Sequence, residues 1–169
     1  MNQLINSTVL SNFASVQRLD LLRDVSFSRF VPLEIYREIQ EGQQMGYTFY
    51  LGIEKILHPF AADGWLHLVT MNADELLLFT SLPAKLHPGE AACLCIARNR
   101  SWGFLTDDRA ARTQAQLWSV PTSGTLGILA LAIEDGKLTL TEGNSLLQAM
   151  ILYANYRSPI DDLSTILPH

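Results

Sequence analysis

The sequence predicts an α/β domain in which a mostly parallel sheet has helices on both faces, with further helices towards the C-terminal end. Short apolar or alternating segments, typical of strands, alternate along the chain with segments of helical periodicity. The chain has 169 residues, of which 48% are hydrophobic. That length and composition suit one domain with a single core, so we expect one domain over residues 1–169.

The N-terminal segment predicts a strand followed by two helices. Residues 3–6 (QLIN) have the character of a short buried strand. Ser7 or Thr8 then offers an N-cap for a helix whose apolar side chains recur at helical spacing. Residues 18–25 continue as a second, short helix.

The next segment predicts a strand and two further helices. Residues 26–32 alternate like a strand, and Pro32 stands in the first turn of the helix that follows. We expect Gly42 to cap that helix at its C-terminal end. A helix within residues 53–64 is expected to end at a proline or a glycine.

The remainder of the chain keeps alternating between strand and helix, although residues 74–86 stay ambiguous. The expected elements are a strand over 65–71, a helix over 87–99, a strand over 101–106, a helix over 107–117, a strand within 118–124 and a helix over 125–136. Residues 139–169 are expected to form a C-terminal extension of two helices, which cover the core or form an interface with a partner.

Charge and hydropathy limit the classes of function. Only 17% of residues are charged and the net charge is −5, which argues against binding nucleic acid by bulk electrostatics without a local basic patch or a bound cation. The low charge content leaves apolar surface that suits a homodimer. No apolar run reaches the length of a membrane span and no signal peptide is recognisable, so we expect a cytoplasmic protein.

Sulfur and imidazole ligands are not arranged for a metal. Cys93 and Cys95 are the only cysteines, and their spacing points them in different directions around a helix, so both are expected in the core. The histidines are scattered without ligand spacing. Any metal therefore has to bind oxygen ligands.

Oxygen-bearing side chains follow two of the expected strands. Asn6 follows the first strand, and Asp107 and Asp108 follow the strand over 101–106. The carboxyl ends of parallel strands meet at one edge of a sheet, where Glu38 and Glu90 on neighbouring helices can join them. Such a cluster attracts Mg²⁺ or Mn²⁺, because a hard cation neutralises the repulsion between packed carboxylates.

Several motifs, in this order, resemble the PIN-domain family. They are INSTVLSNF, LDLL, VPLEIYREI, HPGEAACLCIARN, FLTDDRAAR and SGTLGILALAIEDG. The chain is more narrowly similar to a prokaryotic PIN-like subfamily often labelled a domain of unknown function. The resemblance is strongest over residues 1–138. It implies a ribonuclease that depends on Mg²⁺ or Mn²⁺, acts on RNA, and is the toxin of a type II toxin–antitoxin pair with an antitoxin protein as its partner.

The resemblance also implies roles for individual residues. Asn6 takes the place of the first acid, where most active members have Asp, and Glu38 and Glu90 take the second and third places. Asp107 or Asp108 takes the fourth. The implied substrate-binding residues are Ser7, Arg109 and Arg112.

Other interpretations of these residues stay open. Asn6 suits a helix cap, Glu38 a solvated helix face, Glu90 the first turn of a helix, and one of the two aspartates an N-cap. The arginines equally suit a solvated helix face. At the level of the protein, the alternative is a catalytically degenerate PIN-like module that binds protein or nucleic acid without cleaving it.

Overall fold

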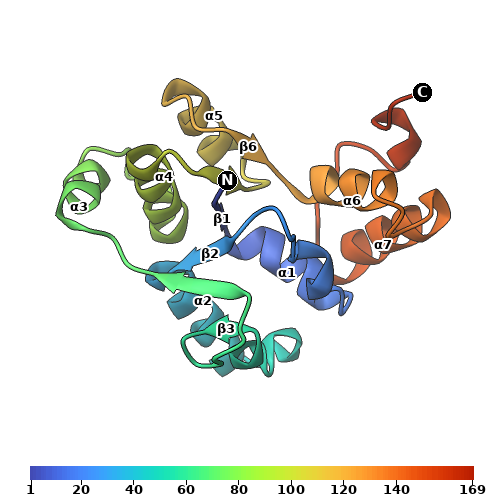
Figure 1. Cartoon of the computed structure of the whole chain (residues 1–169), viewed down its shortest axis with the longest axis horizontal. Helices are drawn as coiled ribbons and strands as arrows, with labels where there is room; N and C mark the ends of the chain where they lie inside the picture. Colours follow the sequence, from blue (N-terminus) through green and yellow to red (C-terminus); the bar gives the residue numbers. More distant parts are fainter.

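A computed structural model describes residues 1–169. Its centre is a six-stranded sheet in the order β3-β4-β2-β1-β5-β6, in which every pair of neighbours is parallel (Figure 1). The strands are β1 (Gln3–Ile5), β2 (Arg29–Pro32), β3 (Leu57–His58), β4 (Leu66–Val69), β5 (Gly103–Leu105) and β6 (Thr122–Ser123). The predicted parallel sheet is confirmed.

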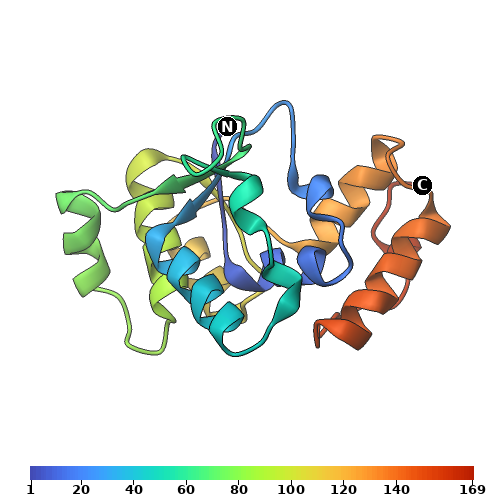
Figure 2. The same cartoon turned by 90° about the horizontal axis from the view of Figure 1, so that it is seen from below.

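Helices cover both faces of this sheet. They are α1 (Ser7–Ser15), α2 (Leu33–Gln44), α3 (Ala73–Thr80), α4 (Pro88–Arg100), α5 (Arg109–Leu117), α6 (Thr125–Glu134) and α7 (Leu140–Tyr153). Four single 3₁₀ turns are η1 (Leu19–Leu22), η2 (Thr48–Tyr50), η3 (Ile53–Lys55) and η4 (Leu163–Thr165). α4 packs on β1, β2 and β5 with α2 and α3 beside it, while α1, α6 and α7 lie on the other side (Figures 1 and 2).

The core is continuous through the sheet and the helix α4. Residues 91–97 of α4 are all buried, and small side chains among them let the helix lie close to the strands. Cys93 and Cys95 are buried and unpaired, as predicted. On α7, Met150 is fully buried and so completes the domain's own core, whereas Tyr153 is 72% exposed.

Several local predictions are wrong. Residues 18–25 contain only the 3₁₀ turn η1 in place of the expected short helix. The N-cap of α1 is Asn6 rather than Ser7 or Thr8, because the Asn6 side chain accepts a hydrogen bond from the Val9 N–H. Gly42 is buried inside α2, which continues to Gln44, and it does not cap the helix. A Cβ at position 42 would come within 3.1 Å of the Tyr47 ring, so the glycine makes room for that ring.

The segment predicted as a helix within residues 53–64 instead contains η3 and the edge strand β3. Leu57 and His58 pair with β4, and this tertiary pairing overrides the local periodicity. A Cβ on Gly64 would meet backbone atoms of residues 56–58 at 2.5–2.8 Å, so the returning chain passes too close for any side chain. In the C-terminal extension, only α7 is a full helix, and the second expected helix is reduced to η4.

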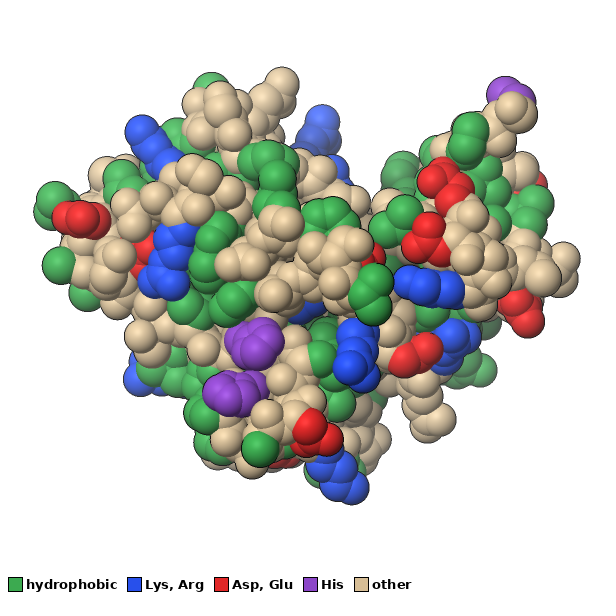
Figure 3. Space-filling view, in the orientation of Figure 1, with side chains coloured by type: hydrophobic (Ala, Val, Ile, Leu, Met, Phe, Trp, Pro, Cys, Tyr) green, Lys and Arg blue, Asp and Glu red, His purple; other side chains and the backbone are tan.

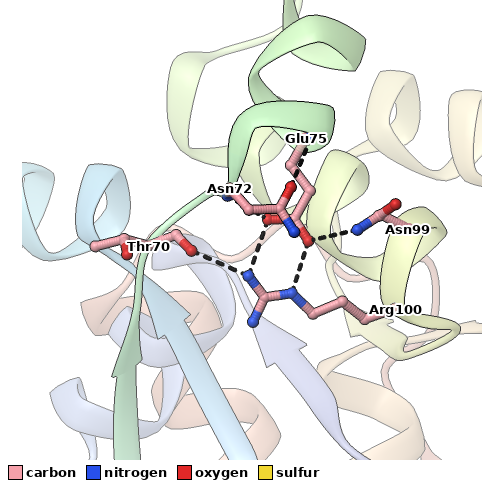
Figure 4. A network of polar contacts seen from close by, with 5 residues as sticks. All are labelled: Thr70, Asn72, Glu75, Asn99 and Arg100. Atoms are coloured by element: carbon pink, nitrogen blue, oxygen red, sulfur yellow. Dashed lines mark hydrogen bonds and ion pairs between the residues drawn. The ribbon is translucent and has the colours of Figure 1, made fainter.

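The segment left ambiguous forms α3, which a buried ion pair attaches to α4 (Figure 4). The Glu75 carboxylate is fully buried and accepts hydrogen bonds from Arg100 Nε at 2.6 Å, Arg100 Nη2 at 2.9 Å and Asn99 Nδ2 at 3.0 Å. Asn72 and Glu75 also form a capping box, and Arg100 reaches the Thr70 carbonyl. Burial alone would raise the pKa of Glu75, but the hydrogen bonds from Arg100, Asn72 and Asn99 outweigh it and lower that pKa.

Candidate metal and nucleic-acid site

The candidate site lies where β1 and β5 end and the helices α1 and α5 begin. The two strands are adjacent and parallel, so their last residues lie side by side. Asn6 Nδ2 donates a hydrogen bond to Thr106 Oγ1 at 2.7 Å, which joins residues 100 positions apart. The sheet therefore brings together the chain segments on which the sequence analysis placed the first and fourth acids.

Asn6 is fully buried and uses its amide group within the fold. Its Oδ1 accepts hydrogen bonds from the Val9 N–H at 3.1 Å and the Thr8 hydroxyl at 2.9 Å. These two bonds use both lone pairs of the oxygen. The geometry thus gives Asn6 the role of a helix cap and of a link between β1 and β5.

The two consecutive aspartates have different surroundings. Asp108 is the N-cap of α5, with its Oδ2 accepting from the Ala111 N–H at 2.7 Å, and its side chain lines a cleft. Asp107 accepts hydrogen bonds from the Thr125 N–H at 2.9 Å, from the Thr125 hydroxyl and from Asn12 Nδ2 at 3.3 Å. Asp107 therefore holds the start of α6 against α1, and Asp108 is the more available of the two.

Glu38 projects from α2 beside the beginning of α4. Its Oε1 lies 2.8 Å from Nδ1 of His87, the residue that precedes α4. A Cβ on Gly89 would come within 2.4 Å of Glu38 Oε1 and 2.3 Å of Ile35 Cδ1. The absence of a side chain at position 89 is thus what allows the Glu38 carboxylate to lie against α4.

Glu90 is half-buried in the first turn of α4, and the site raises its pKa to about 7. The largest cause is desolvation by burial, followed by repulsion from Asp108, with a smaller contribution from Glu38. A hydrogen bond that the Glu90 carboxylate accepts from the His87 backbone, and the charge of His87, act in the opposite direction. Carboxylates from three separate helices therefore influence one another electrostatically here.

These side chains line a branched cleft. Its central part has a volume of about 490 Å³ and contains Ser7, Thr8, Glu38, Glu90 and Asp108. A hollow of about 220 Å³ continues past Thr8 and Asp108, and its far wall is formed by residues 154–157. The structure thus brings Ser7, Glu38, Glu90 and Asp108 together around the central part and Asp107 beside the smaller hollow. Asn6 lies beneath the cleft, and Arg109 and Arg112 line neither part.

The donor atoms fit a hydrated divalent cation better than a fully protein-bound one. No three His, Cys, Asp or Glu side chains lie close enough to hold an ion by themselves. Mg²⁺ commonly keeps several waters and takes only one or two carboxylates directly. The mutual repulsion that raises the pKa of Glu90 is the kind of charge imbalance that such a cation relieves.

The basic residues expected to bind RNA are placed differently from one another. Arg109 is exposed at the start of α5. Arg112 donates from Nε to the Thr106 carbonyl at 2.9 Å, so it supports the end of β5. On the face seen in Figure 3, Lys and Arg side chains are scattered and form no broad basic patch.

Two residues of the cleft were missed by the sequence analysis. Arg157 lines the smaller hollow beside Asp107 and Asp108, and no motif marks it because it lies in the segment after α7. His87 was treated as one of several scattered histidines, but it contacts Glu38. Its position directly before the Pro-Gly-Glu start of α4 was the available signal. His58 and His67 lie side by side on β3 and β4 with ring centroids 5.5 Å apart, and neither lines the cleft.

The parallel sheet, with its acid-lined cleft at the carboxyl edge, defines a nuclease-type α/β fold. A family model described as a PIN domain matches residues 3–168, and the chain belongs to this family. A search among curated proteins finds no match. None of the helices combines the length and apolar character that a membrane span requires.

Proposed function

We propose that the protein is a ribonuclease that depends on Mg²⁺ or Mn²⁺ and hydrolyses phosphodiester bonds of RNA. The observation that carries this proposal is the convergence of Glu38, Glu90 and Asp108 on one cleft at the carboxyl edge of the sheet. Membership of the PIN-domain family supports it. Perturbed carboxylates gathered in a cleft are typical of functional sites.

Each residue of the cleft has a definable part in this chemistry. Glu38, Glu90 and Asp108 would hold a hydrated cation, one or two of them directly and the rest through its waters, and the cation would supply an activated water and stabilise charge on the phosphoryl oxygens. The His87 imidazole orients Glu38 through the contact of 2.8 Å. Arg157 in the adjoining hollow and Arg109 on α5 are placed to bind phosphates of the RNA strand, and the Ser7 hydroxyl lines the cleft.

The direct test is an assay of purified protein on single-stranded and structured RNA, with Mn²⁺ compared with chelator. We expect cleavage with Mn²⁺ that stops when the chelator is added. Metal-dependent protection of the fold provides a second readout, because a ligand that binds only the folded state raises its thermal midpoint. Absence of both effects would contradict the proposal.

A catalytically degenerate binding module is the second candidate. It is favoured by Asn6, which is neutral, fully buried and bonded through both lone pairs of its amide oxygen. The same assay separates the two candidates. A degenerate module would bind RNA or a protein partner without cutting RNA at any Mn²⁺ concentration.

We further propose that the protein acts as the toxin of a toxin–antitoxin pair and forms a homodimer. Exposed apolar side chains at the end of α7, Leu152 at 71% and Tyr153 at 72%, support a surface for self-association. Light scattering at tens of micromolar tests the dimer. Growth arrest on expression, relieved by co-expression of the adjacent upstream reading frame, tests the toxin role.

Replacing Asn6 with Asp is expected to make the fold depend on metal. The Thr106 hydroxyl accepts a hydrogen bond from Asn6 and can turn to donate one to the new carboxylate, which therefore keeps a partner. The new carboxylate nevertheless adds a buried charge next to an acidic cleft. We expect the thermal midpoint of Asn6→Asp to lie below that of the wild type in chelator and to recover on addition of Mn²⁺. Asn6→Ser, which keeps a capping side chain without charge, is the control.

The same variant also tests the role of Asn6 in the metal site. A carboxylate near the cation should strengthen Mn²⁺ binding and increase cleavage. Unchanged metal affinity and unchanged metal dependence of the midpoint would mean that Asn6 is a structural cap only.

A further inference from the structure

A groove lined by aromatic side chains continues from the acid cleft and passes between the end of α2 and the end of α7. It shares Ser7, Thr8, Glu38 and His87 with the cleft and has a volume of about 440 Å³. Its outer part is formed by Met45, Tyr47, Phe49, Tyr50 and Tyr153. The groove is therefore an arm of the cleft and not a separate cavity.

Two of these rings are exposed, and neighbouring residues hold the first of them, Tyr47, in position. Tyr47 is 51% exposed, and its ring stacks on Phe49 with centroids 5.7 Å apart and planes inclined by 24°. The edge of the same ring rests against Gly42, where a Cβ would be only 3.1 Å from it. Tyr153 is 72% exposed and stands between this groove and a second hollow that Phe49 also lines.

The inner end of the groove is connected to the acid-bearing segment. The Tyr50 hydroxyl donates a hydrogen bond to the Ser7 carbonyl at 3.1 Å. Ser7 directly follows Asn6 and also lines the acid cleft. The distance between the aromatic arm and the carboxylates is thus fixed by the fold.

The charge of the groove decides what kind of group it accepts. Its ionisable side chains other than tyrosine are Glu38, Glu41 and His87, and it contains no Lys or Arg. Such a groove does not favour a phosphate. The smaller hollow on the other side of Thr8 contains Arg157 beside Asp107 and Asp108, so it offers a guanidinium group with which a phosphate can pair. A flat, uncharged aromatic group suits the exposed tyrosine rings, and every nucleobase has such a face.

We propose that the aromatic groove is a nucleobase subsite in which Tyr47 and Tyr153 stack on an unpaired base adjacent to the cleaved phosphodiester. This inference rests on the proposed ribonuclease function and assigns residues that select the substrate. A base can enter the groove only when it is unstacked from its own strand, so the subsite favours single-stranded segments over duplex.

The test measures binding of a short single-stranded oligoribonucleotide with one 2-aminopurine, whose fluorescence changes on stacking. The measurement uses the Glu90→Gln background with Mn²⁺, so that cleavage does not interfere. Tyr47→Leu and Tyr153→Leu keep apolar bulk but remove the aromatic face. We expect each to weaken binding at least about 5-fold, since stacking on one base contributes about 1–3 kcal/mol.

Two kinds of control make the result specific. Tyr47→Phe and Tyr153→Phe keep the ring and should bind within about twofold of the parent. Phe60→Leu removes another exposed aromatic side chain, which is 56% exposed, is tilted against the Tyr36 ring and does not line the groove. This variant should bind like the parent.

The outcomes separate the subsite from the proposed function. Mn²⁺-dependent cleavage by the wild type, with unchanged RNA affinity in both Leu variants, would overturn the subsite and leave the ribonuclease intact. Equal losses of affinity for single-stranded and duplex RNA in the Leu variants would also overturn the subsite. Loss of a dimer by Tyr153→Leu without any change in RNA affinity would assign the groove to a second copy of the chain. If the wild type neither binds nor cleaves RNA, both proposals fail.

Discussion

Glu90→Gln is expected to reduce Mn²⁺-dependent RNA cleavage by about 100-fold or more, while making the metal-free protein more stable. The loss of activity follows because the carboxylate is one of three that face the cleft and would hold the cation, whose charge stabilisation contributes several kcal/mol. The gain in stability follows because the neutral amide avoids the desolvation of a buried charge and also ends the repulsion with Asp108 and Glu38. Cleavage kinetics and thermal unfolding in chelator measure the two effects.

The stabilising effect should depend on pH. The folded state raises the pKa of Glu90 from 4.5 to about 7. The protonated group therefore contributes stability that is fully present below pH 4.5 and is lost as the pH rises through about 7. Solvent screens this half-buried group, so we expect Glu90→Gln to raise the thermal midpoint at pH 8 by about 2–4 °C, corresponding to about 1 kcal/mol. At pH 4 the two proteins should unfold at the same temperature.

The matched control is Glu134→Gln. Glu134 is an exposed acid at the end of α6 that lines neither the cleft nor the aromatic groove and does not contribute to the raised pKa of Glu90. This variant should keep its cleavage rate and its metal-free midpoint. A Glu90→Gln protein that cleaves RNA at the wild-type rate would remove Glu90 from the site.

Arg100→Met is expected to cause the largest loss of stability, about 3–5 kcal/mol, or on the order of 10 °C in the thermal midpoint. The Glu75 carboxylate is fully buried, and Arg100 supplies two of its hydrogen bonds. Methionine retains the apolar stem but leaves the buried charge without its partner. Thermal or urea unfolding in chelator measures the effect independently of the acid cleft.

Three comparisons identify the cause of this loss. Adding Glu75→Gln to Arg100→Met removes the buried charge, keeps a side chain for the capping box and should regain most of the stability. Arg98→Met on the same helix removes an exposed arginine whose Cζ lies 4.4 Å from the centroid of the Trp118 ring. This variant should lose about 1 kcal/mol or less of unfolding free energy. The difference in unfolding free energy between Arg100→Met and the wild type should become smaller at acid pH. The lowered pKa of Glu75 gives the wild type stability that is lost as the pH falls below about 4.5. A difference that stays constant down to pH 3 would contradict the ion-pair explanation.

Much of the fold could be predicted because the responsible signals are local. The buried strand at residues 3–5 and the helix that begins at Pro88 carry apolar or small residues in the appropriate pattern. The strand β3 could not be predicted, because its two residues become a strand only by pairing with β4. Gly42 was misassigned because its reason is a tertiary contact with Tyr47 and not the end of a helix.

The candidate site likewise contains residues that the sequence indicates and residues that only the folded chain brings into place. Glu38, Glu90 and Asp108 lie in motifs whose order along the chain resembles a known family, so the sequence indicates them as candidates, and the structure places them around one cleft. Arg157 belongs to no motif, and only the return of the chain after α7 brings it beside the acids. The function of Asn6 as a cap depends on the atoms around its amide group, which the sequence does not specify.

The hydrogen bond between Asn6 and Thr106 also constrains when the site can form during synthesis. The two residues are 100 positions apart, and β1 gains β5 as a neighbour only after residues 103–105 exist. Pairing between such distant segments is slow compared with local helix formation. A nascent chain that ends at α2 already carries Glu38. It still lacks the strand β5, the acids Glu90, Asp107 and Asp108, and the wall of residues 154–157 that complete the cleft. A chain still at this stage of synthesis therefore lacks the complete cleft.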